Sequence, residues 1–244
     1  MRVVSILFAF SFLFVSCGEQ EEEHNLQIYF HHYVDEFKLS DTHFSNDSII
    51  FQNNETEWFS VRRLLYVLSD IVLFFEDGST QILDDYFFIN TEDNSTLTKS
   101  IKVSSLCSGI SFTVGFSSYN NIDNFYINDP NGFHDQMLWP NSFGLNAFQG
   151  GYHYMKLEGK CVANDEELFY NVHTGPLDSQ DYSIPISTLY TEPTLLLSLN
   201  MNIKNWFNDP IYNINYYGSG IMGNEDAQQS LNQNGLDVFS VESL

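Results

Sequence analysis

The chain reads Leu26-Gln27-Ile28-Tyr29-Phe30-His31-His32-Tyr33-Val34 where its folded part is expected to begin. Apolar side chains recur at every second position of this stretch, and that period is typical of a strand with one buried face. His32 lies on the apolar face, so a histidine ends the buried side of the first predicted strand. The chain also holds 22 Phe and 14 Tyr residues, which favour sheet over helix.

Further short apolar runs, separated by turn residues, predict more strands. The predicted segments are 59–75, with a break near Ser69-Asp70, then 80–83, 84–88, 101–103, 110–116, 152–157, 168–173 and 194–199. The turn Glu76-Asp77-Gly78-Ser79 predicts a hairpin between its two flanking runs. We therefore expect a mostly β fold, a Greek-key β-sandwich or barrel of about eight strands.

Small helices are expected near the carboxyl end of the chain. One short helix opens at Asn202 and runs through Trp206. A second helix has Asn224 as its amino-terminal cap and Gly235 at its end. No internal repeat or long linker interrupts the sequence. Residues 26–244 are therefore expected to form a single domain, with these small C-terminal helices packed on the sheets.

The first residues have the zones of a secretory signal. Arg2 supplies the positive start of residues 1–16, and the apolar run that follows is too short to span a bilayer. Leu13-Phe14-Val15-Ser16-Cys17-Gly18 then forms a lipobox. We expect residues 1–16 to be removed as a lipoprotein signal peptide and Cys17 to carry the lipid that anchors the chain to a membrane.

Residues 17–25 form an acidic tether after the lipidated cysteine. Such residues resemble the export signal that sends lipoproteins to the outer face of the outer membrane in some Gram-negative lineages. We expect a surface-exposed outer-membrane lipoprotein, with the periplasmic face as the alternative. The whole chain has 9 basic and 32 acidic residues, a net charge of −23, which argues against nucleic acid as a partner.

Two cysteines remain besides Cys17. Cys107 and Cys161 each lie beside a predicted strand. An even pair in an oxidising compartment favours a disulfide between them, and two free buried cysteines are the alternative.

Residues 117–150 form a long connection rich in Asn, Gly and aromatic residues. A connection of this length in a compact domain is usually functional or disordered, and its Phe, Met and Trp content argues against disorder. It could bind a glycan or another envelope protein through its aromatic side chains. It also carries His134 and Met137, which are candidates for accessory metal contacts, and Trp139.

Three histidines stand at the ends of predicted strands. They are His32, His153 and His173, and imidazoles that face one side suit copper or zinc. Their spacing makes no local metal motif such as His-Glu-x-x-His. Histidines that are hydrogen-bonded or exposed remain the alternative interpretation.

Several patches of sequence share a family likeness when they are read together. They are Phe30-His31-His32-Tyr33-Val34-Asp35, Phe59-Ser60-Val61-Arg62-Arg63-Leu64-Leu65-Tyr66-Val67-Leu68-Ser69-Asp70, Met137-Leu138-Trp139-Pro140, Gly150-Gly151-Tyr152-His153-Tyr154-Met155-Lys156-Leu157-Glu158-Gly159 and Asn171-Val172-His173-Thr174-Gly175. Together they resemble the MbnP-like family, copper-binding proteins associated with methanobactin operons and their lipoprotein relatives. The resemblance spans roughly residues 26–242, and Asn141 stands where the family often has a second tryptophan.

The resemblance implies a copper site with named ligands. In the characterised branch of the family, histidines and a kynurenine bind one copper ion, and a partner di-haem enzyme related to cytochrome c peroxidases makes that kynurenine from a tryptophan. Trp139 is then the residue to be oxidised, with His153 and His173 as ligands and His32 as a third. Opening the indole ring yields an aryl amine and a carbonyl, whereas intact indole can only donate a hydrogen bond.

The sequence favours a binding protein over an enzyme. It contains no serine nucleophile elbow, no Gly-rich phosphate loop and no paired carboxylate motif. In the family interpretation, too, the oxidative chemistry belongs to the partner.

Overall fold

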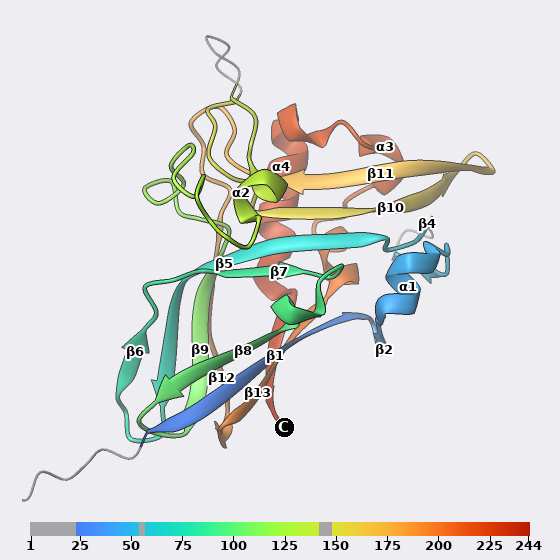
Figure 1. Ribbon diagram of the computed structural model, residues 1–244. Helices are drawn as coiled ribbons and strands as arrows, with labels where there is room; N and C mark the ends of the chain where they lie inside the picture. Colours follow the sequence, from blue (N-terminus) through green and yellow to red (C-terminus); the bar gives the residue numbers. More distant parts are fainter. Residues whose placement is uncertain (1–22, 54–56, 142–147) are drawn as a thin grey trace, which may run out of the picture.

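The computed structural model describes residues 23–53, 57–141 and 148–244, and these are mostly β. The signal peptide, Cys17 and most of the acidic tether lie outside the described residues. Within the described part, the strands form two sheets that curl into a half-barrel or sandwich (Figure 1). The mostly β class and the small C-terminal helices are confirmed.

Five strands form the smaller sheet. They are β1 (His24–Val34), β2 (Phe37–Lys38), β8 (Thr98–Val103), β13 (Leu196–Asn202) and β14 (Phe239–Ser243). β1 lies between β8, to which it is antiparallel, and β13, to which it is parallel. The first strand therefore pairs with a strand about 170 residues later in the chain, as in the pair Phe30 and Leu199.

Nine strands form the larger sheet. They are β3 (Phe51–Gln52), β4 (Trp58–Phe59), β5 (Arg63–Phe75), β6 (Thr80–Ile82), β7 (Phe87–Asn90), β9 (Cys107–Val114), β10 (Met155–Ala163), β11 (Glu166–Thr174) and β12 (Ile184–Thr194). β5 runs through its centre and bends where the register shifts between Ser69 and Val72, and Asp70 has a φ of 51° there. The predicted break in this run is therefore a bulge inside one long strand.

Short helices complete the described chain. They are α1 (Asp41–Asn46), α2 (Phe133–Met137), α3 (Ile214–Tyr217) and α4 (Glu225–Asn234), with the 3-10 helices η1 (Asn94–Leu97), η2 (Ile203–Phe207), η3 (Ile221–Gly223) and η4 (Gly235–Asp237). The Asn224 side chain accepts a hydrogen bond from the backbone N–H of Ala227, as its predicted capping role requires. None of the helices in this part of the chain has the length and apolarity needed to cross a membrane.

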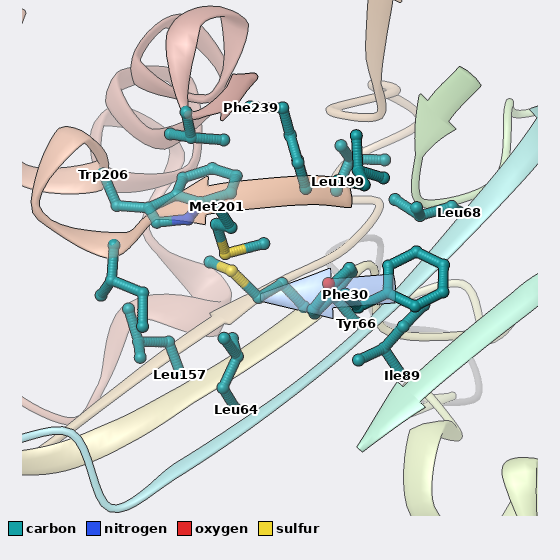
Figure 2. Packing of buried hydrophobic residues seen from close by; sticks show 14 of the residues in the cluster. Phe30, Leu64, Tyr66, Leu68, Ile89, Leu157, Leu199, Met201, Trp206 and Phe239 are labelled. Carbon is teal, nitrogen blue, oxygen red and sulfur yellow. The ribbon is translucent and has the colours of Figure 1, made fainter. Parts of the chain in front are cut away.

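The main core fills the space between the two sheets. Phe30 of β1 and Met201 of β13 pack there with Leu157 of β10 and Trp206 of η2, as Figure 2 shows. Tyr66 of β5 also points into this core, whereas its neighbour Leu65 points to the opposite face of the larger sheet. The larger sheet therefore has two covered faces, and the outer one carries the second cluster that includes α2.

The expected disulfide is not formed, because both cysteines are free and buried. Cys107 of β9 pairs with Phe75 at the end of β5, whereas Cys161 of β10 pairs with Phe59 of β4. The two thiols are therefore held near opposite ends of the segment that runs through β5. Counting cysteines could not reveal this, since a disulfide needs the two Cα atoms within about 7 Å.

Candidate metal site

Three of the predicted site residues meet at one end of β10 and β11. His153 stands two residues before β10 begins, His173 is next to the last residue of β11, and Trp139 follows α2. Figure 1 shows α2 beside these strand ends. The backbone N–H of Trp139 donates to Gly151 at 2.9 Å, and that of His153 donates to Met137 at 2.7 Å. These bonds join the segment after α2 to the chain that enters β10.

The rings of these three residues are in contact. The ring centroids of Trp139 and His153 are 4.7 Å apart with an interplanar angle of 76°, and those of His153 and His173 are 5.3 Å apart at 85°. Trp139 and His153 are buried, whereas 17% of the His173 side chain is exposed. Among the described residues, the group is therefore buried at Trp139 and His153 and partly exposed at His173.

His153 has one ring nitrogen in use and one free. Its Nδ1 lies 3.1 Å from the carbonyl oxygen of Met137. Because a carbonyl can only accept, Nδ1 carries the proton and Nε2 keeps a lone pair. Nε2 is buried and has no hydrogen-bond partner among the described residues. Burial, followed by repulsion from Lys156 and His173, lowers the pKa of His153 well below its usual value, so the ring stays neutral, as a metal ligand must be.

His173 is bound to an acidic side chain on the neighbouring strand. Its Nε2 lies 2.9 Å from a carboxylate oxygen of Glu158 in β10. The hydrogen bond from His173, with the nearby guanidinium groups of Arg63 and Arg62, holds the pKa of Glu158 below its usual range. Glu158 is therefore ionised at neutral pH and is a pure acceptor.

Trp139 lies against a glycine at the end of β11. A Cβ atom added to Gly175 would come within 2.5 Å of the indole ring, so only glycine leaves room for this packing. The indole Nε1 is buried and has no hydrogen-bond partner in the described part of the chain. A buried donor without an acceptor is costly, and a change in the chemistry of this ring could remove that cost.

Gly175→Ala is expected to destabilise the fold by about 1–3 kcal/mol, because the new methyl group must push the indole of Trp139 aside. Urea unfolding of both proteins measures the difference. Gly220→Ala is the matched control, since nothing lies within 4 Å of its added Cβ. In a Trp139→Leu background the Gly175→Ala penalty should shrink, and an unchanged penalty would show that the indole is not its cause.

His32 does not join this group, which corrects the prediction of a third ligand. It is buried in β1, its Nε2 is 3.1 Å from the Tyr66 hydroxyl, and its ring packs on Tyr66 and Phe44. Tyr66 faces the core between the sheets. His173 alternates with Val172, which also faces that core, so the His173 side chain points to the other face of the larger sheet. The sheet therefore separates His32 from the site.

The accessory candidates contribute differently from what their chemistry suggested. The side chain of Met137 is buried in the second cluster, and its carbonyl oxygen faces His153 instead of its sulfur. The Nδ1 atom of His134 lies 2.9 Å from the hydroxyl oxygen of Tyr152. In the described part of the chain, neither side chain forms a hydrogen bond or a ring contact with His173 or Trp139.

Two polar residues that the sequence analysis did not assign support the site. Glu158 is one. It follows Lys156 by two residues in a strand, so the sequence could predict that these two side chains share a face of the sheet, but not that Glu158 contacts His173. The other is Gln228 of α4, whose buried amide donates to the carbonyl of His173 at 2.9 Å and accepts from the N–H of Gly175 at 3.3 Å. α4 thus fixes the end of β11. The sequence could have indicated this role, because Gln228 lies three residues before Leu231 and so falls on the apolar face of the predicted helix.

The donor set fits one small soft or borderline ion. Two imidazoles on one ion, with metal–nitrogen bonds of about 2 Å, have ring centres roughly 5–6 Å apart, and His153 and His173 meet this condition. No group of three or more His, Cys, Asp or Glu side chains suited to a metal occurs among the described residues. The side chain at position 139 is in ring contact with His153.

Comparison with known proteins gives one family and one similar structure. A sequence profile of the family described as MbnP matches residues 23–223. The solved structure of MbnP from Methylosinus trichosporium has a similar fold, with a TM-score of 0.54 at 10% sequence identity, over 77% of this chain and 78% of that chain. A search of curated proteins found no match.

Proposed function

Because the chain belongs to the MbnP family, we propose that it binds one copper ion between His153, His173 and the side chain at position 139. The observation that carries the proposal is the buried, neutral imidazole of His153, whose Nε2 has a free lone pair beside a second imidazole. Imidazole nitrogens are good ligands for copper, and the surplus of acidic residues draws cations toward the protein.

The third donor in this proposal is Trp139 after oxidation to kynurenine. The indole itself offers no lone pair, whereas the aryl amine and the carbonyl of kynurenine do. Oxidative opening of the five-membered ring breaks its carbon–carbon double bond and removes one carbon as formate. In this four-electron oxidation, water supplies the new oxygen atoms, and the electrons pass through the haem irons of a di-haem peroxidase-like partner enzyme to two molecules of hydrogen peroxide, which are reduced to water. Trp139 is already in contact with His153, so the new donor would form beside the first ligand.

The proposed address is a membrane surface. A lipid on Cys17 would anchor the chain shortly before β1, in the outer membrane and preferably on its outer face. β1 starts at His24, which pairs with Val103 near the Phe75 end of β5. The site lies beside the first half of β5, where Lys156 pairs with Leu65 and the carbonyl of Tyr154 accepts from the N–H of Val67. Figure 1 shows the start of β1 at the lower left, and α2 with the adjoining ends of β10 and β11 above β5.

Copper content tests the proposal directly. The full chain, produced by a host that also makes the di-haem partner and purified without added metal, is expected to carry close to one copper per chain by elemental analysis. Its intact mass should exceed the unmodified value by the defined increment for kynurenine, and a Trp139→Phe variant should lack that increment. A folded protein with copper at background would contradict the proposal.

The long connection supports a second candidate function, the binding of a glycan or another envelope protein. Part of it presents large apolar side chains to solvent: Tyr119 is 87% exposed and Phe125 is 63% exposed, with Ile122 and Ile127 also exposed. Exposed aromatic rings of this kind are typical of binding surfaces. A Tyr119→Ala, Phe125→Ala variant should lose such a partner and keep its copper, so the two functions can be separated.

A further inference from the structure

Glu158 lies directly behind one of the two imidazoles of the candidate site. We propose that it is a positioning residue, which fixes His173 so that its Nδ1, together with Nε2 of His153, faces the metal ion. The inference rests on the proposed function. It adds which ring nitrogen of each histidine binds the ion, and it names Glu158 as the group that leaves Nδ1 of His173 free. The evidence is the hydrogen-bond acceptor that each of the two rings contacts in the structure.

The two histidines are held by different acceptors at different ring nitrogens. The carbonyl of Met137 accepts from Nδ1 of His153, at 3.1 Å. The carboxylate of Glu158 accepts from Nε2 of His173, at 2.9 Å. In each neutral ring the other nitrogen has the lone pair, and a metal-binding histidine commonly donates its second N–H to a carbonyl or a carboxylate. The pair therefore offers one Nε2 and one Nδ1.

The carboxylate of Glu158 is itself held in place. Arg62 donates to its second oxygen at 2.8 Å, and a guanidinium nitrogen of Arg63 is 3.8 Å from the oxygen that His173 uses. The backbone of the same residue is fixed too, because the N–H of Arg62 donates to the Glu158 carbonyl at 2.8 Å. A buried carboxylate with two cationic partners has little freedom to turn, so it defines the orientation of the ring that it contacts.

Glu158 is set back from the ion in this arrangement. Its Oε1 is occupied by the N–H of His173 and its Oε2 by Arg62. The guanidinium groups of Arg62 and Arg63 offset the charge of Glu158. Removing the carboxylate should therefore weaken the site without removing a ligand. This distinguishes Glu158 from His153 and His173, whose loss removes donor atoms.

The protonation of the two rings can be read without any metal. In the metal-free protein at about pH 8, above the usual imidazole pKa of about 6.5, long-range nitrogen–proton NMR spectra should show His173 protonated on Nε2 and His153 on Nδ1. In Glu158→Gln the His173 signals should shift toward a mixture of the two forms, whereas those of His153 stay unchanged. Finding His173 protonated on Nδ1 in the unsubstituted protein would overturn the inference.

Copper affinity gives the second measurement. Glu158→Gln is expected to weaken copper binding about 10–100-fold, with one ion still bound, as is usual for the loss of a group behind a ligand. The matched control is Glu92→Gln, which removes a carboxylate 2.9 Å from the Nε of Arg63 but has no contact with His173. Glu92→Gln should bind copper as the unsubstituted protein does. Equal affinity in both variants, with thermal unfolding unchanged, would overturn the positioning role.

The two proposals fail in different ways. If the unsubstituted protein binds no copper, the proposed function fails, while the NMR result still tests how Glu158 orients His173. If copper binds tightly and Glu158→Gln has no effect on affinity or on the His173 signals, the proposed function stands and the positioning role falls.

Discussion

Replacing His153 and His173 together with alanine is expected to reduce copper in the purified protein to background. The two side chains supply the only pair of contacting imidazoles that the structure brings beside Trp139 among the described residues. The loss should exceed the roughly 10–100-fold effect expected for a group behind the ligands, because here the donor atoms themselves are removed. Competition against a Cu(I) chelator under anaerobic conditions measures the affinity of each variant.

Two histidines outside the site provide the controls for that experiment. His32→Gln and His134→Ala each remove an imidazole, but the first lies on the other face of the larger sheet and the second contacts Tyr152. Both variants should bind copper as tightly as the unsubstituted protein. Full copper retention by the double alanine variant would exclude His153 and His173 as ligands, and a loss in His32→Gln would restore the three-histidine hypothesis.

The second large effect is expected in the acid stability of the protein, and it comes from His32. Burial, followed by repulsion from His31 and Lys38, lowers the pKa of His32 to about 3 in the folded chain. In the unfolded chain the ring titrates near about 6.5. Between these two values the unfolded state binds a proton that the folded state does not, so the stabilisation is complete above about pH 6.5 and is lost as the pH falls toward 3.

His32→Gln should therefore flatten the dependence of stability on pH. From pH 7 to pH 5, His32 alone should lower the free energy of unfolding by about 2 kcal/mol, and the variant should lack this part of the loss. Urea unfolding at several pH values measures it, and the contribution of His153 cancels because both proteins contain that residue. Parallel curves for the two proteins would contradict a neutral buried His32.

The sequence predicted the parts of the fold that local patterns control. The alternation in Leu26–Val34, the hairpin after Phe75 and the helix between Asn224 and Gly235 all depend on neighbours in the chain. The parallel pairing of β1 with β13 joins residues about 170 positions apart, and no local period can predict it. The same limit applies to the cysteines. The distance between them depends on the pairing of β9, which carries Cys107, with β5 and of β10, which carries Cys161, with β4.

The site was predictable in part for a similar reason. Family likeness led to Trp139, His153 and His173, and the structure brings these three together. His32 was correctly expected on the apolar face of its strand, but a period of two residues cannot say which layer of the protein that face meets. The role of Glu158 depends on the register between β10 and β11, which only the folded chain reveals.

The central claim is that His153 and His173 share one copper ion, and a crystal of the copper-loaded full chain tests it most directly. An anomalous difference map, measured at the copper absorption edge, should show one strong peak about 2 Å from Nε2 of His153 and from a ring nitrogen of His173. A peak at His32 or on the acidic surface, with none between these two rings, would contradict the account.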